Sequence, residues 1–189
     1  MSETTETLRL EPNPGNICFG CGGANDFGMK LVFEQDNARR KIVGRFVLGP
    51  RYRGGAGMAH GGIIAVLLDE AMGKVCRFSE ARAVTAEMTI EYLKPVNVEK
   101  EIIVEAYEEQ HLRKGRNLFH VGEIRSGEGQ VLARGRGRFV IVEPKQPRNN
   151  ARSSDFQSAK VGVRRAEENR DGCEENKWQR QESKWQRER

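Results

Sequence analysis

The spacing of apolar residues changes along the chain, and the changes predict its secondary structure. Apolar side chains recur every three, four and seven residues from 63 to 75, which predicts an amphipathic helix. From 84 to 92 apolar and polar residues alternate, which predicts a strand that stops before Pro95. Further strands are expected at 29–34, 42–48, 100–107, 117–124 and 130–142. Two strands, one long helix and four strands fit an antiparallel sheet around a central helix, an α+β arrangement.

The two ends of the chain lack such a pattern. Residues 1–16 are polar, contain two prolines and are expected to be disordered or extended. Residues 144–189 are poor in apolar side chains and end in a short repeat, KWQRQES then KWQRER. This composition indicates a basic, disordered tail. We therefore expect one domain at 17–143.

The positive charge is concentrated in the tail. The chain has a net charge of +5, yet residues 1–143 hold 20 Lys and Arg against 19 Asp and Glu. The domain thus carries no general nucleic-acid signal, and no nucleic-acid partner is expected. No apolar run approaches the roughly 18 residues that span a bilayer, and the acidic N-terminus is unlike a secretory signal. We expect a cytoplasmic protein without a membrane span.

The predicted helix begins at a glycine pair and carries one acid in apolar company. Gly61 and Gly62 lack side chains where helix N–H groups are unsatisfied, so an anionic group can approach the backbone closely. Asp69 falls at the edge of the apolar face of the helix. Glu70 points to another side, where Lys74 stands four residues further on, and is predicted to be a solvated acid. The helix thus offers a hydrogen-bond donor for an oxyanion at its start and a base further along. A tight turn into a core helix whose acid is simply hydrogen-bonded explains the same residues without chemistry.

The distance between donor and acid predicts how such a site is assembled. Eight residues of helix separate Gly61 from Asp69, which is about 12 Å. A single reacting carbonyl needs donor and base both within roughly 3 Å. One copy of the chain cannot supply both, so the site would be shared between two copies in a two-fold dimer.

The cysteines do not indicate a disulfide framework. Cys18 and Cys21 form one C-x-x-C pair in a glycine-rich stretch, while Cys76 and Cys173 stand alone. A structural zinc site normally uses two such pairs, or one pair with histidines at finger spacing, which this chain lacks. A plain loop is favoured over a zinc site or a redox pair. We expect no metal and no cofactor.

Longer motifs make the chain resemble a known family, the hotdog-fold acyl-CoA thioesterases, in the PaaI-like branch of the 4-hydroxybenzoyl-CoA thioesterase superfamily. The motifs are CFGCGGANDFGMKLVF, YRGGAGMAHGGIIAVLLDEAMG, AVTAEMTIEYLKPV and GQVLARGRGRFV. The most specific feature is an HGG whose histidine stands nine residues before an aspartate, with a threonine sixteen residues later. The resemblance covers residues 17–142. It implies a hotdog fold that dimerises through sheet edges, often as a dimer of dimers.

The resemblance also implies roles for individual residues. The aspartate matching Asp69 is the general base or nucleophile that acts on the thioester. The amide of the glycine matching Gly61 polarises the carbonyl, and His60 shapes that loop. The residue matching Thr85 orients the water or the acid, in a site that crosses the dimer interface. The chain departs from the family at Gly54, where several relatives carry an asparagine.

These roles imply hydrolysis of an acyl-CoA thioester to a free acid and CoA. Gly62 is expected to contribute to substrate binding, and the turn with Arg113, Lys114 and Arg116 offers cations for the CoA phosphates. A turn that only keeps a sheet end soluble is the alternative for this cluster. The alternative function is a non-catalytic acyl-CoA binder or sensor. A hydratase is disfavoured, because its acid precedes its histidine, the reverse of the order here.

Overall fold

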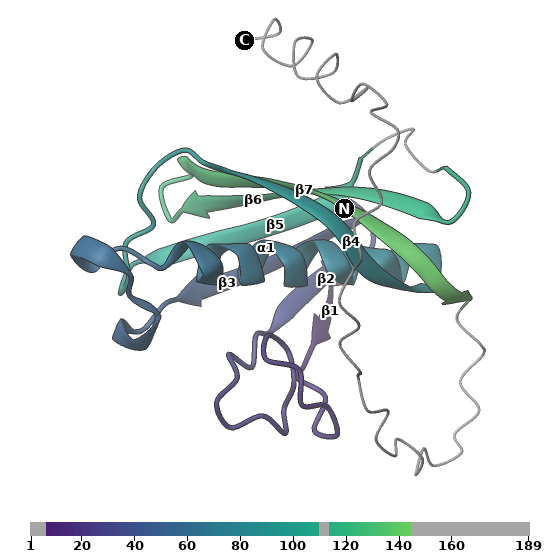
Figure 1. Ribbon diagram of the computed structural model, residues 1–189, viewed down its shortest axis with the longest axis horizontal. Helices are drawn as coiled ribbons and strands as arrows, with labels where there is room; N and C mark the ends of the chain where they lie inside the picture. Colours follow the sequence, from purple (N-terminus) through teal and green to yellow (C-terminus); the bar gives the residue numbers. More distant parts are fainter. Residues whose placement is uncertain (1–6, 110–113, 145–189) are drawn as a thin grey trace, which may run out of the picture. The chain divides into compact units, whose positions relative to one another are not determined.

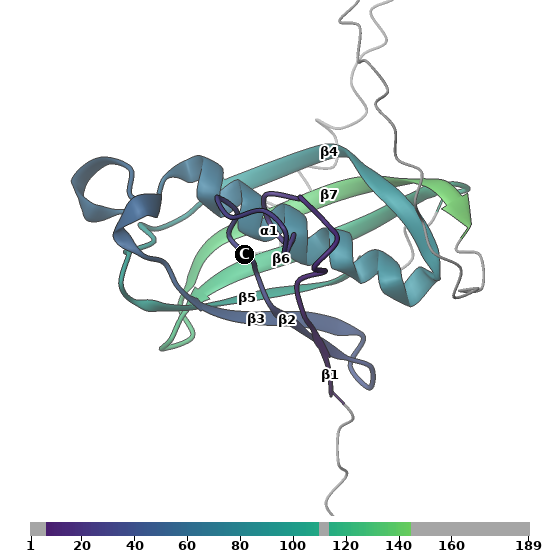
Figure 2. The ribbon, with the colours of Figure 1, turned by 90° about the horizontal axis from the view of Figure 1, so that it is seen from below.

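The long helix α1 lies lengthwise inside an antiparallel sheet that curves around it (Figure 1, Figure 2). This computed structural model describes residues 7–109 and 114–144. Within them, the seven strands of the sheet lie in the order β1-β2-β3-β5-β6-β7-β4. In chain order the elements are β1 (Thr7–Leu10), β2 (Phe33–Asp36), β3 (Lys41–Val47), η1 (Pro50–Tyr52), η2 (Gly55–Gly57), α1 (Gly61–Val75), η3 (Cys76–Ser79), β4 (Ala81–Tyr92), β5 (Glu101–Glu108), β6 (Asn117–Ser126) and β7 (Val131–Pro144). The predicted α+β hotdog fold is confirmed.

The core forms where the apolar face of α1 meets the sheet. The buried residues of the helix are Ile64, Leu67, Leu68, Ala71, Met72 and Val75. Each fully buried Leu or Met contributes about 2 kcal/mol to folding. A Cβ built on Gly122 or Gly135 would lie 3.2 Å from the Leu68 side chain, so these sheet glycines let the helix approach closely. None of the described helices combines the length and apolar character that a membrane crossing requires.

The N-terminal part of the prediction needs correction. In the segment expected to be disordered or extended, residues 7–10 are extended and form β1, which pairs with β2. The strand predicted at 29–34 is wrong in its bounds, since β2 begins at Phe33. The reason is that Lys30 has a φ of 50°, which no strand accommodates. The other predicted elements agree with the structure to within three residues. The predicted tail lies outside the described residues, except for residue 144 at the end of β7.

A β-bulge in β4 changes which residues face the helix. β7 pairs with Thr85 and then with Glu87, which leaves Ala86 as the extra residue. Residues on either side of a bulge exchange faces relative to a regular strand. Thr85 therefore lies on the same face as Met88, although strict alternation placed them on opposite faces. Val84, predicted to share the face of Met88, is instead 52% exposed.

His120 on β6 closes the C-terminal end of α1. Its Nδ1 donates to the carbonyl of Met72 at 2.8 Å, one of the helix-end carbonyls that need an outside partner. The ring stacks on Phe139 with centroids 4.9 Å apart. Nε2 is buried without a hydrogen-bond partner among the described residues. Burial lowers the pKa of His120 to about 4, so the ring is neutral at physiological pH.

The buried histidine should make folding stability depend on pH. Above pH 6.5 His120 is neutral in both the folded and unfolded states and contributes no pH dependence. Between pH 6.5 and about 4 only the unfolded chain binds the proton, so the free energy of unfolding falls as the pH falls. The total loss is about 3 kcal/mol. Urea unfolding of wild type and His120→Gln between pH 7 and 4 measures it, since glutamine keeps a donor for Met72 but does not titrate. An equally steep dependence in the variant would assign the effect to another group.

Candidate active site

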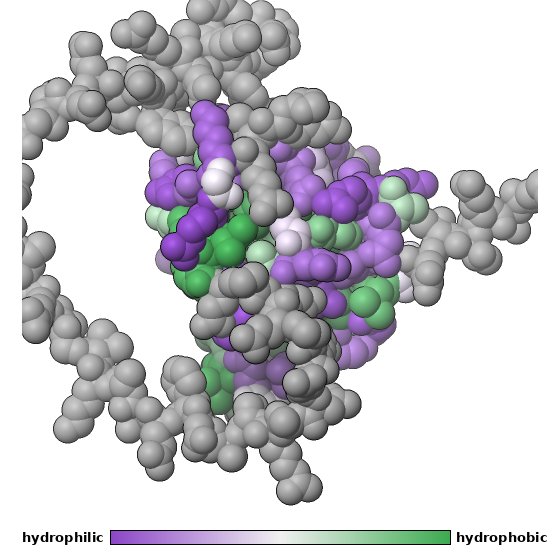
Figure 3. Space-filling view, turned by 90° about the vertical axis from the view of Figure 1, so that its right-hand side faces the viewer, coloured by the Kyte–Doolittle hydropathy of each residue, from purple (hydrophilic) through white to green (hydrophobic). Residues whose placement is uncertain are grey.

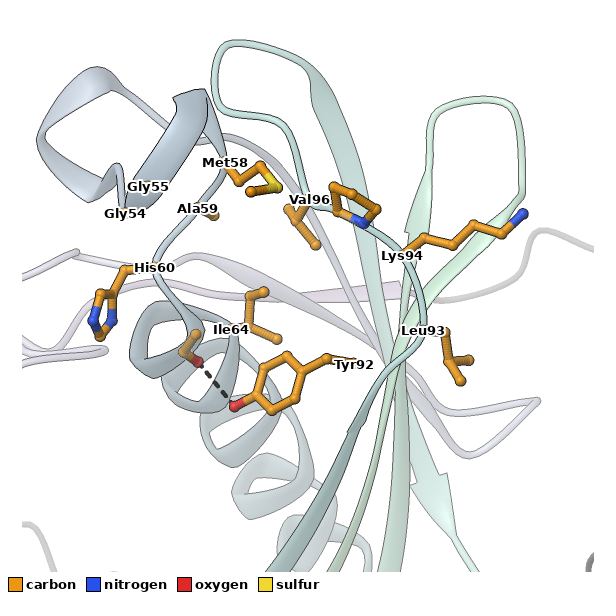
Figure 4. A pocket seen from close by; sticks show the side chains of 12 residues that line it. Gly54, Gly55, Met58, Ala59, His60, Ile64, Tyr92, Leu93, Lys94 and Val96 are labelled. Carbon is orange, nitrogen blue, oxygen red and sulfur yellow. Dashed lines mark hydrogen bonds between the residues drawn. The ribbon is translucent and has the colours of Figure 1, made fainter.

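A cleft of about 390 Å³ opens between the loop that precedes α1 and the end of β4 (Figure 4). Backbone hydrogen bonds hold the loop, from Ala59 N–H to the Val96 carbonyl at 2.7 Å and from His60 N–H to the Tyr52 carbonyl at 2.9 Å. A Cβ on Gly54 would lie only 3.1 Å from the His60 Cα. The asparagine of some relatives at this position would therefore require the loop to shift.

The first turn of α1 presents one unsatisfied backbone donor to this cleft. His60 is the N-cap residue, and its Nδ1 accepts from the Gly62 N–H at 3.0 Å, so Nε2 carries the ring proton. The N–H expected from Gly62 for a substrate is thus already bonded to the protein. Within the described part of the chain, no acceptor bonds the Gly61 N–H. Gly61 is therefore the donor that remains for a ligand.

Tyr92, at the end of β4, is a site residue that the sequence analysis did not single out. Its hydroxyl donates to the Gly61 carbonyl at 3.2 Å, reaching across the cleft to the start of the helix (Figure 4). The bond fixes the peptide plane next to the free N–H. The sequence does contain one signal for this role, because Tyr92 stands at the end of the predicted strand that carries Thr85, shortly before Pro95.

The predicted acid lies further along the same helix. Asp69 is half-buried, and its Oδ1 accepts from the Thr85 hydroxyl at 2.7 Å. The bulge in β4 is what turns Thr85 toward the helix. Among the described residues, Oδ2 of Asp69 has no hydrogen-bond partner, so one carboxylate oxygen is held and the other is available. This pair is oriented for accepting a proton or for attack.

The structure does not bring the donor and the acid together within one copy. α1 is continuous from Gly61 to Val75, so the helix rise keeps Gly61 and Asp69 about 12 Å apart. The cleft is lined by Gly61 but not by Asp69. Within one copy, the two groups therefore cannot both contact a single carbonyl.

Glu70 is not the solvated acid that the helical pattern predicted. Its side chain is 14% exposed and pairs with Lys74 at 2.9 Å. It also accepts a hydrogen bond from the Cys18 thiol at 3.2 Å. Burial alone would raise the pKa of Glu70, but Lys74 and the hydrogen bonds hold it below its usual value. The prediction is wrong because a distant loop covers this face of the helix.

Two of the three predicted CoA-binding cations, Lys114 and Arg116, lie at the turn that leads into β6. Arg113 lies outside the described residues. Lys114 and Asn117 exchange backbone hydrogen bonds of 3.1 and 3.0 Å, which close the turn. Arg116 donates through Nε and Nη2 to the Ile141 carbonyl at 2.8 and 2.6 Å, so its guanidinium ties the turn to β7. Lys114 is exposed.

Comparison with known proteins finds similarity to thioesterases. The family model described as the thioesterase superfamily matches residues 56–133, a range that contains His60, Gly61, Asp69 and Thr85. Acyl-coenzyme A thioesterase THEM4 of Rattus norvegicus is 31% identical over 123 residues, covering 64% of this chain and 51% of the relative. The chain thus spans about half the length of the curated relatives it matches.

Solved structures share the fold. A thioesterase superfamily protein is 27% identical with a TM-score of 0.58, covering 63% of this chain and 57% of the other. The E. coli PaaI protein from the phenylacetic acid degradation operon is 20% identical with a TM-score of 0.52, covering 56% and 75%. Both share the sheet and the central helix of this chain.

Proposed function

We propose that this protein hydrolyses acyl-CoA thioesters to a carboxylic acid and CoA. The proposal rests mainly on one observation. A single helix presents the unbonded N–H of Gly61 at the cleft, and two turns further on it carries Asp69, whose carboxylate is held by a hydrogen bond. An oxyanion donor and a base or nucleophile are what thioester hydrolysis needs. The activity named for THEM4 supports the proposal.

The proposed reaction assigns one role to each of these residues. Water attacks the thioester carbonyl carbon while Asp69 accepts its proton, and the Gly61 N–H stabilises the charge that forms on the carbonyl oxygen. The tetrahedral intermediate then expels the CoA thiolate, which takes up a proton as the carboxylic acid forms. If Asp69 attacks directly, a mixed anhydride forms first and water cleaves it to the same products. Thr85 holds Oδ1, which orients the carboxylate in either case.

We propose that two copies form each site. β4 is twelve residues long and lies at the edge of the sheet, and it carries apolar side chains that are half exposed, Val84 at 52% and Tyr92 at 55%. A long, apolar edge strand favours pairing with another strand. A two-fold dimer through β4 would supply Gly61 from one copy and Asp69 from its partner, and a dimer of dimers extends the same scheme.

Two further parts of the proposal concern substrate and location. Lys114 and its neighbours Arg113 and Arg116 are proposed to meet the CoA phosphates, a role that stays a prediction. The exposure of Lys114 supports this role. The hydrogen bonds from Arg116 to the Ile141 carbonyl instead favour a structural role for Arg116 in stabilising the turn. A cytoplasmic location is supported by the unpaired thiols of Cys18, Cys21 and Cys76, since disulfides are rare there.

Complementation between two inactive variants tests both the function and the shared site. Asp69→Asn lacks the base, and Gly61→Pro lacks the N–H, so each alone should retain about 1% or less of the wild-type thiol release from acyl-CoA. After subunit exchange at equal concentrations, half of the dimers are mixed and each mixed dimer has one intact site. Recovery should therefore approach a quarter of the wild-type activity.

Two controls give the experiment a definite reading. Two different affinity tags report whether subunits have exchanged, and confirmed exchange without recovered activity would contradict the shared site. Isothermal titration with the same acyl-CoA esters reports binding. Wild-type protein that binds these esters and releases no thiol would instead be a non-catalytic acyl-CoA binder.

A further inference from the structure

Two thiols and a carboxylate meet where the N-terminal loop, residues 11–32, covers α1. The Sγ atoms of Cys18 and Cys21 and a carboxylate oxygen of Glu70 all lie within 4.8 Å of one another. This loop lies below α1 in Figure 1 and passes in front of it in Figure 2. We propose that the three residues bind one Zn²⁺ ion, with water as the fourth ligand. The site would clip the loop to the helix beside Asp69.

The spacing of the three ligand atoms suits tetrahedral zinc. Zinc binds thiolate at about 2.3 Å and carboxylate oxygen at about 2.1 Å, so neighbouring ligand atoms lie roughly 3.5 to 4 Å apart. The Cys18 Sγ is 3.2 Å from the Glu70 Oε1, and all three atoms fall within the 4.8 Å limit. Thiolate ligands select zinc over magnesium and calcium, which prefer oxygen.

Two glycines allow the loop to close over the carboxylate. A Cβ on Gly20 would lie 2.3 Å from the Glu70 Oε1, and one on Gly22 would lie 2.4 Å from the Asn16 carbonyl oxygen. No other residue type fits at either position without moving the backbone or Glu70. The Gly22 N–H donates to the Cys18 carbonyl at 3.0 Å, which closes the turn that carries both sulfur atoms. The CFGCGG stretch is thus shaped around Glu70.

The charges in this region balance with the ion bound. Lys74 pairs with the Glu70 Oε2 at 2.9 Å, which leaves Oε1 for the ion. Without the ion, both thiols are neutral, and the charges of the Glu70 carboxylate and the Lys74 ammonium sum to zero. Zn²⁺ displaces one proton from each thiol, so the net charge of the cluster and Lys74 stays zero. Lys74 would also orient the ligating carboxylate, as outer partners of metal ligands do.

The sequence alone favours a plain loop, because it holds no second cysteine pair and no histidines at zinc-finger spacing. The third ligand is instead a glutamate on the helix, 49 residues beyond Cys21.

Metal titration of the full chain tests the proposal without reference to hydrolysis. The protein is reduced, stripped of metal and made in a Cys173→Ser background, so that Cys76 is the one thiol outside the cluster. Zn²⁺ measured against a chromophoric chelator should bind at one equivalent. Co²⁺ should give a sulfur-to-cobalt charge-transfer band and the visible bands of tetrahedral coordination. Zinc at 100 times its dissociation constant should raise the melting temperature by about 5 to 10 °C.

Variants assign the ligands. Cys18→Ser and Cys21→Ser should each weaken zinc binding at least about 100-fold, and Glu70→Gln at least about 10-fold with both thiols intact. Cys76→Ser is the matched control and should bind like the parent, because Cys76 belongs to the hydrophobic core. Absence of the cobalt charge-transfer band in fully reduced protein would overturn the proposal. So would a zinc stoichiometry that persists in the Cys18→Ser, Cys21→Ser double variant.

Discussion

Replacing Asp69 by asparagine is expected to lower kcat for acyl-CoA hydrolysis by about 10³- to 10⁴-fold, with little change in KM. Asparagine keeps the shape of the side chain and accepts the hydrogen bond from Thr85, but it cannot take a proton or attack the carbonyl. The loss should fall on kcat because the carboxylate acts in the transition state rather than in substrate binding. Thiol release at saturating acyl-CoA measures it.

Three comparisons separate this loss from a general loss of charge or structure. Asp26→Asn is the matched control, since the Asp26 side chain is 90% exposed, and it should keep wild-type activity. Thr85→Val should cost about 10-fold through loss of the bond that orients Asp69, and Thr85→Ser should restore most of the rate. More than a tenth of wild-type activity in Asp69→Asn would show that another group performs the reaction.

Replacing Gly61 by proline is expected to lower kcat by about 10²-fold, because it removes the single N–H proposed to stabilise the oxyanion. Gly61 is the first residue of α1, where proline is well tolerated. The preceding residue must be extended, and His60 already has φ −63° and ψ 137°. The helix should therefore form normally, and circular dichroism and the melting temperature should match the wild type.

Gly61→Ala is the control for adding atoms without removing the donor. A Cβ on Gly61 would meet the Tyr92 ring at 3.6 Å, an ordinary van der Waals contact. This variant keeps the N–H and should stay within about 10-fold of wild type, since it changes no transition-state hydrogen bond. Equal losses in Gly61→Ala and Gly61→Pro would assign the effect to steric blocking of the cleft and contradict the oxyanion role.

The distribution of side chains on the surface limits where partners can bind. On the face shown in Figure 3, polar and charged residues predominate, with separate apolar patches between them. The half-exposed apolar residues of β4 are part of a strand edge, so both backbone pairing and apolar contact are available there. The proposed dimer uses this edge.

The elements that carry the site could be read from the sequence because their signals are local. Helical spacing and a glycine pair placed the start of α1 close to Gly61, and the helix rise separated Gly61 from Asp69. These statements depend only on residues within one element, and the structure agrees with both. The resemblance to hotdog thioesterases extended this local pattern to Thr85, which bonds Asp69.

What the sequence could not supply depends on contacts between distant segments. The bulge at Ala86 arises from pairing with β7, and without it Thr85 faces away from the helix. Glu70 has the pattern of a solvated acid within α1, but the loop that carries Cys18 buries it. Helical spacing places a side chain around its own axis and contains no information about what covers it. The sequence by itself thus determined the helix, its N–H donor and its acid, whereas the tertiary structure decided what each of them touches.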